Sequence, residues 1–142
     1  MSTILSGRMV KFVSPLPKEV PMVARVNRQI LLKSRPEGAP SLDNFTLKQS
    51  SVPEPGDGEV LMRTRWLSLD PYMRGRMSAA KSYAKPVEVG ATMVGGTVGE
   101  VVASRNPNFA VGDIAMGYGG WQDYAVSRTA RIPPSSARCL SL

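Results

Sequence analysis

Short β-prone runs, punctuated by glycine and proline, constrain the fold of this chain more than any other feature of its sequence. The 142 residues include 13 glycines and 12 prolines. The strongest turn signal is Pro53-Glu54-Pro55-Gly56-Asp57-Gly58, which leads into the long β-prone run Glu59–Leu69. Such frequent punctuation favours many short strands over long helices.

Within the run after this turn, alternation places Val60, Met62, Thr64 and Trp66 on one face and Leu61, Arg63 and Arg65 on the other. Five further segments are predicted as strands, namely 29–33, 45–49, 93–102, 111–118 and 121–126. The glycines within 93–102 are typical of bulges or tight bends. The predicted fold class is therefore mainly β, a partly open barrel with short helical or irregular connectors.

The sequence divides into three parts. Residues 1–24 contain prolines that deny a helix its hydrogen bonds and are predicted to be an irregular extension. Residues 25–127 carry the strands of the barrel domain. Residues 128–142 lack periodicity, are rich in Ser, Arg and Pro, and are predicted to be a disordered or out-of-frame tail.

The net charge of +7 is concentrated at the two ends of the chain. Residues 1–35 hold seven basic residues against one acidic residue, and residues 127–142 hold three basic residues and no acid. Residues 36–126 hold eight basic against ten acidic residues, and a single aromatic residue, Phe12, lies among the terminal charges, too few for base stacking. We therefore expect no specific nucleic-acid partner.

Neither a membrane span of about 18 apolar residues nor a signal peptide is recognisable. A cytoplasmic location, with no membrane partner, is therefore the expectation.

Cysteine and histidine counts exclude several kinds of chemistry. The chain has one cysteine, Cys139, and no histidine. An intramolecular disulfide is impossible, and a zinc site of the usual Cys/His composition is excluded. A Ser-His-Asp triad or a Cys-His pair is excluded for lack of an imidazole.

Four clustered glycines, Gly90, Gly95, Gly96 and Gly99, allow two interpretations. A dinucleotide-binding loop would need a helix directly after it and an acidic residue about 20 positions further on. The residues that follow, Val98–Val102, have the character of a strand. The pattern therefore favours glycines within barrel strands.

The most specific motif is Leu69-Asp70-Pro71-Tyr72-Met73-Arg74-Gly75-Arg76-Met77. Together with Leu32–Pro40, Met93–Val98, Val111–Asp113 and Gly119–Tyr124, it resembles the alkenal, prostaglandin and curcumin reductase branch of the zinc-free medium-chain dehydrogenase/reductases. The resemblance runs from about Val26 to about Val126. It implies a GroES-like barrel, the catalytic-side domain of a two-domain enzyme that uses NADPH and no zinc.

The resemblance also implies a reaction and its residues. This branch transfers hydride from NADPH to the β-carbon of an α,β-unsaturated ketone or aldehyde. Carried over by position, Tyr72 lies beside the nicotinamide and the substrate, and Tyr83 lines the substrate cleft. A phenol suits this task because it donates a hydrogen bond near a developing enolate. For Asp70, Arg74 and Trp121 a structural role is favoured over a catalytic one.

The sequence departs from this branch at both ends. The residues before about Met22 and after about Arg128 have no counterpart in it, and the family's Rossmann domain, its main NADPH site, is expected to be absent. We therefore expect a truncated reductase, weakly active or inactive alone, whose full-length form would be a homodimer. The alternative is a non-catalytic β-barrel module that binds small ligands or a partner chain.

Overall fold

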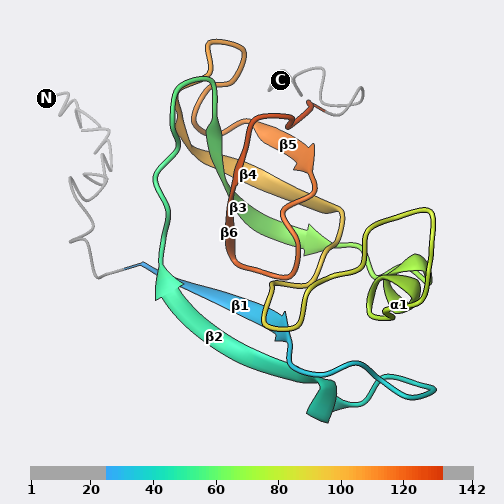
Figure 1. Ribbon diagram of the computed structural model, residues 1–142. Helices are drawn as coiled ribbons and strands as arrows, with labels where there is room; N and C mark the ends of the chain where they lie inside the picture. Colours follow the sequence, from blue (N-terminus) through green and yellow to red (C-terminus); the bar gives the residue numbers. More distant parts are fainter. Residues whose placement is uncertain (1–24, 133–142) are drawn as a thin grey trace, which may run out of the picture.

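The structure of the protein is a computed structural model that describes residues 25–132. The predicted extension 1–24 and the last ten residues of the predicted tail lie outside this range. The elements in chain order are β1 Val26–Leu32, the 3-10 turn η1 Leu42–Asn44, β2 Phe45–Ser51, β3 Val60–Leu67, α1 Tyr72–Arg76, β4 Thr97–Ser104, β5 Ile114–Gly117 and β6 Tyr124–Ser127 (Figure 1).

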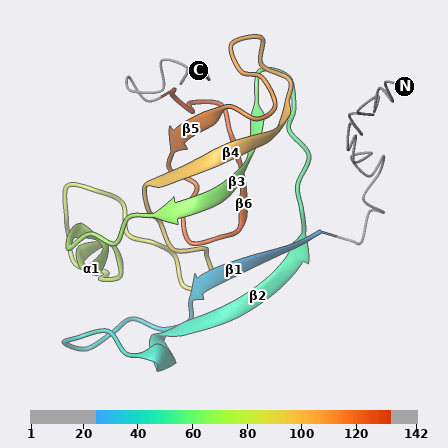
Figure 2. The same ribbon diagram turned by 180° about the vertical axis from the view of Figure 1, so that it is seen from behind.

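The strands form two antiparallel sheets that lie one beside the other (Figures 1 and 2). β1 pairs with β2 in register from Val26↔Ser51 to Leu32↔Phe45, and the larger sheet has the order β5-β4-β3-β6. Isolated bridges join the second edge of β1 to residues 92 and 122. The fold is mainly β and open rather than a closed barrel, which confirms the predicted class.

The long strand β3 does not keep the simple alternation predicted for it. Its register against β4 shifts at Leu61/Met62 and again at Thr64/Trp66. A bulge inserts an extra residue and changes the face to which the following side chains point. Val60 and Met62 are buried, whereas Trp66, which alternation alone would place on the same face, is 65% exposed.

Two clusters of buried side chains form the core. One lies under β1 and the loop after α1, and contains Leu32, Met77, Val87 and Met93. The other lies within the larger sheet, and contains Val60, Met62, Val101 and Ala115. The two clusters share no residue. Polar groups therefore also contribute to the contact between the sheets.

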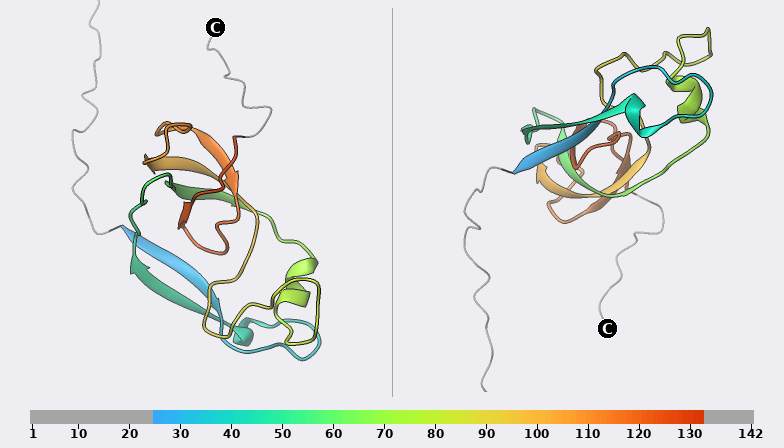
Figure 3. Two further views of the ribbon diagram at one scale, coloured as in Figure 1. Left: turned by 45° about the horizontal axis from the view of Figure 1, so that its top comes forward. Right: turned by 90° about the horizontal axis from the view of Figure 1, so that it is seen from below.

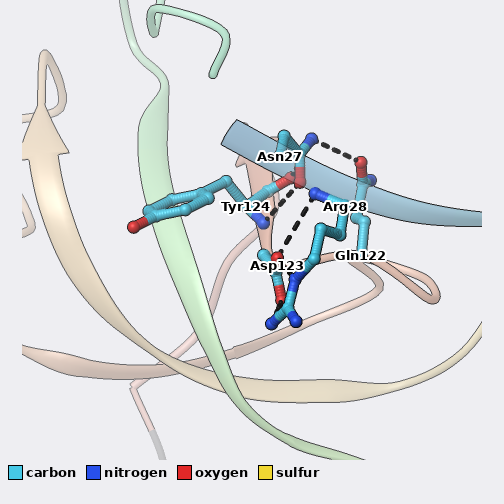
Figure 4. Close-up of polar contacts among 5 residues, drawn as sticks. All are labelled: Asn27, Arg28, Gln122, Asp123 and Tyr124. Atoms are coloured by element: carbon cyan, nitrogen blue, oxygen red, sulfur yellow. Dashed lines mark hydrogen bonds and ion pairs between the residues drawn. The ribbon is translucent and has the colours of Figure 1, made fainter. Parts of the chain in front are cut away.

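Asn27 of β1 supplies a buried polar contact between the two sheets (Figure 4). Its side chain is 2% exposed. The amide Nδ2 donates to Gln122 Oε1 at 3.1 Å and to the Tyr124 carbonyl at 3.0 Å, and Oδ1 accepts from the Tyr124 N–H at 2.9 Å. The side chain thus pairs with the start of β6 as a neighbouring strand would.

Residues 128–131 belong to the folded body, a few residues beyond the boundary of 127 predicted from the sequence. Arg131 and Met116 exchange backbone hydrogen bonds of 2.7 and 2.8 Å at the free edge of β5. Ala130 packs against the cluster in the larger sheet, and Arg128 donates to the Asp57 carbonyl at 3.2 Å.

Candidate functional site

The residues of the Leu69–Met77 motif form the end of the turn after β3 and the short helix α1. β3 ends at Leu67, and the Ser68 N–H donates to the Gly96 carbonyl at 2.9 Å. The Ser68 hydroxyl then donates to Asp70 Oδ2 at 2.7 Å, and α1 begins two residues later. Asp70 therefore makes a local structural contact, as expected.

Two arginines tie α1 to the loop between β1 and β2, which lies beside it (Figure 3). Arg74 donates to the Gly38 carbonyl at 2.8 Å and to the Pro36 carbonyl at 3.1 Å. In the opposite direction, Arg35 of the loop donates to the Met77 carbonyl at 2.9 Å. The structural role predicted for Arg74 is confirmed.

Glycine at position 95 allows the segment before β4 to approach α1. A Cβ atom added to Gly95 would lie 2.8 Å from Leu67 Cδ1 and 3.1 Å from Met73 Cε. The strand β4 begins directly afterwards, at Thr97, and contains Gly99. The glycines near 95–99 are therefore part of the β-sheet region, and within the described residues no helix follows them.

Tyr72 and Tyr83 lie on different parts of the chain, one at the start of α1 and the other in the connector after it, and both side chains are exposed. Tyr72 is the first residue of α1 and is 37% exposed, whereas Tyr83, in the connector after α1, is 94% exposed. In the described part of the chain no hydrogen bond or ring contact joins them. Each phenol therefore faces solvent independently of the other.

A groove that the sequence did not indicate lies at the end of β3 and the start of β4. It has a volume of about 570 Å³ and does not include Tyr72 or Tyr83. We call it the Trp66–Tyr118 groove; it is lined by Trp66, Leu67, Ser68, Gly96, Thr97, Val98, Met116, Gly117, Tyr118, Thr129 and Arg131. Trp66 and Tyr118 were predicted only as members of strands, and neither was predicted to line a site.

A second, smaller hollow of about 330 Å³ lies at the junction of the sheets. Trp121 lines it and also stacks on Phe45, with 5.5 Å between ring centroids, which confirms the core role predicted for Trp121. Asp123 lines it as well and accepts from Arg28 Nε at 2.7 Å and Nη2 at 3.1 Å. The hydrogen bond from Arg28 is the main reason that the pKa of Asp123 lies below its usual 3.8.

Over residues 25–132, no cluster of three or more Cys, Asp or Glu side chains has the arrangement of a metal site. The helices within that range are too short to cross a bilayer.

Comparisons with known proteins identify relatives over most of the described residues. Residues 28–134 match the family described as the N-terminal domain of oxidoreductase. The chain is 56% identical over 101 residues to the NADPH-dependent curcumin reductase of Escherichia coli (strain K12). The aligned region covers 71% of this chain and 29% of that protein. The chain is 36% identical over 106 residues to the NADP(+)-dependent 2-alkenal reductase of Nicotiana tabacum, covering 70% and 30%.

The fold is also similar to that of a solved structure, CurA from Vibrio vulnificus in complex with NADPH. The TM-score is 0.71 at 57% sequence identity, and the match covers 74% of this chain and 32% of that one. The chain thus spans about a third of the length of the proteins it matches.

Proposed function

Because this chain belongs to the family of N-terminal oxidoreductase domains, we propose that it is the substrate-side domain of an NADPH-dependent reductase. The proposed reaction is reduction of the C=C bond of α,β-unsaturated ketones or aldehydes without zinc. The observation that carries the proposal is the 56% identity to an NADPH-dependent curcumin reductase. Similarity to a 2-alkenal reductase supports the same class of substrate.

The residues around the start of α1 suit the nicotinamide end of NADPH. Tyr72 presents a partly exposed ring there, and the hydrogen bond from Ser68 to the Gly96 carbonyl holds the glycine segment next to it. A Cβ atom added to Gly96 would meet nothing within 4 Å, so a flat ring has room against the backbone. When bound, NADPH supplies the hydride. We propose Tyr72 as the contact with the nicotinamide.

The chain's own part in the reaction is to bind and polarise the enone. As the β-carbon accepts hydride, negative charge develops on the carbonyl oxygen, and an O–H donor aimed at that oxygen stabilises it. Tyr72 and Tyr83 are the phenols proposed for this role. A neutral phenol provides this stabilisation without a metal, which agrees with a chain that has one cysteine and no histidine.

We expect the 142 residues by themselves to reduce enones weakly or not at all. Both proposed phenols face solvent, and Tyr83 is almost fully exposed. Water then competes for the carbonyl oxygen, and the high dielectric of water weakens each hydrogen bond to it.

A chimera tests the proposal. Residues 26–126 of this chain replace the matching segment of the Escherichia coli reductase, and NADPH oxidation is followed with an aliphatic enone. We expect an active chimera in which Tyr72→Phe and Tyr83→Phe each lower kcat/KM by about tenfold or more, since loss of an oxyanion donor costs roughly 100-fold in favourable cases. Tyr124→Phe, which removes a phenol outside the proposed site, is the matched control.

The outcomes separate function from site. A folded chimera without activity would overturn the proposed function. An active chimera that tolerates both Tyr72→Phe and Tyr83→Phe would leave the function standing and refute the assignment of these two residues.

A further inference from the structure

The Trp66–Tyr118 groove has the properties of a second binding site, which adjoins the proposed nicotinamide position at Ser68 and Gly96. Its volume of about 570 Å³ lies within the range of small-molecule sites, about 300–1,000 Å³. It is built from the end of β3, the start of β4 and the strand β5. Neither Tyr72 nor Tyr83 lines it, so its occupant would not lie against the proposed catalytic phenols.

The shape and chemistry of the walls favour a flat apolar ligand. Trp66 is 65% exposed and Tyr118 is 87% exposed, so both rings retain surface on which a ligand ring can stack. Met116, also exposed, adds a polarisable thioether, which packs well against aromatic rings. Rigid aromatic side chains offer large contact areas and lose little conformational entropy when they bind.

The floor of the groove offers few free hydrogen-bonding groups. Thr97 is buried there, and its hydroxyl already donates to the Gly117 carbonyl at 3.3 Å and accepts from the Gly119 N–H at 3.1 Å. Val98 and Leu67 add apolar surface. A ligand with many polar groups would lose its hydration there without replacement, which favours an aromatic body.

One charge at the edge of the groove sets the polarity of the ligand. Arg131 is the sole charged residue among those that line the groove. Within residues 25–132, ion pairs involve Arg28, Arg65, Arg105 and Arg128, and none involves Arg131. Its backbone is fixed by two hydrogen bonds to Met116. A guanidinium held beside an apolar surface is suited to bind a carboxylate through paired hydrogen bonds.

We propose that the Trp66–Tyr118 groove binds a planar aromatic compound that carries a single carboxylate, with the rings against Trp66 and Tyr118 and the carboxylate on Arg131. The groove adjoins the proposed nicotinamide position through Ser68 and Gly96, but neither proposed phenol lines it, and the inference does not depend on the proposed reaction.

The test compares 2-naphthoate with the neutral 2-naphthalenemethanol on the purified 142-residue chain, by titration calorimetry and ligand-observed NMR. We expect 2-naphthoate to bind with a dissociation constant of about 1 mM or lower, as for a small ligand of this size. Arg131→Gln should raise the dissociation constant of 2-naphthoate about fivefold, which is the scale of one exposed charge-assisted hydrogen bond. The affinity for the alcohol should stay unchanged.

Two further variants complete the test. Arg128→Gln removes a nearby arginine that pairs with Glu59 and does not line the groove, so it should leave both affinities unchanged. Tyr118→Ala should lower the affinity for both ligands about equally, because it removes stacking surface and no charge. Since the side chains of Tyr118 and Arg131 are exposed, the far-ultraviolet circular dichroism should not change.

Three results would overturn the proposal. One is no binding of 2-naphthoate at millimolar concentration. Another is equal weakening by Arg131→Gln and Arg128→Gln, which would indicate attraction by the overall charge. The third is binding that Tyr118→Ala leaves unchanged, which would place the ligand elsewhere.

Discussion

Replacing Asn27 by alanine should destabilise the protein more than replacing its neighbour Arg28, although Arg28 forms the ion pair. Asn27 is almost fully buried and makes three hydrogen bonds to the segment that leads into β6. Arg28 pairs with Asp123 at 2.7 Å, but its side chain is largely exposed. The two substitutions therefore compare a buried neutral contact with an exposed charged one at adjacent positions.

The expected loss in free energy of unfolding follows from the groups that Asn27→Ala leaves without hydrogen-bond partners. Gln122 Oε1 keeps a hydrogen bond from Gln29 at 2.8 Å. The Tyr124 N–H and carbonyl lose the partner they have in Asn27, and leaving such groups unpaired costs about 1–3 kcal/mol each when buried. Because Tyr124 is only partly buried, we expect the lower half of that range, a total of about 2–4 kcal/mol.

Urea unfolding followed by circular dichroism and tryptophan fluorescence measures this difference. A loss of about 2–4 kcal/mol would lower the melting temperature by roughly 10–20 °C for a domain of this size. The slope of the free energy of unfolding against urea should stay unchanged, because the same surface is exposed on unfolding. If Arg28→Ala destabilised the protein as much as Asn27→Ala, the exposed ion pair would hold the sheets together and the reasoning would be refuted.

Two further predictions concern a charge and a glycine. The pKa of Asp123 is lower in the folded state than its usual 3.8, so ionised Asp123 stabilises the fold above that pH, and the contribution is lost as the pH falls through the lowered folded value. Urea unfolding at several pH values should therefore show Asp123→Asn less stable than the wild type by about 1 kcal/mol or less at neutral pH, and the difference should shrink below pH 3.8; a constant difference would contradict this. Gly99→Ala should destabilise the protein by about 2 kcal/mol or more, because its Cβ would lie 2.5 Å from the Arg63 carbonyl oxygen. Gly96→Ala, whose Cβ meets nothing within 4 Å, is the control that should keep the melting temperature of the wild type.

Much of the fold could be predicted from local patterns. All six predicted strands are present, and the turn at 53–58 leads into β3 as expected. The motif from Leu69 to Met77 and the segments that accompany it placed the chain in its family, as the match over residues 28–134 confirms. Strand periodicity and turn chemistry are properties of neighbouring residues, so they can be read along the chain.

The uninterrupted alternation predicted for β3 is broken for a physical reason. A bulge depends on how a strand pairs with its neighbour, here the shift between Thr64 and Trp66 against β4. Alternation within one strand contains no information about the register of its partner. The sequence therefore predicted the strand correctly but not the two register shifts within it.

By itself, then, the sequence determined the class of fold, the order of strands along the chain, the family and the residue types available for chemistry. Tertiary structure alone decided that Asn27 meets Tyr124, 97 positions away, and that Trp66, Tyr118 and Arg131 line one groove. Such contacts arise because pairing of distant strands fixes which side chains become neighbours. That pairing is decided by the packing of the whole domain, and no local pattern of residues encodes it.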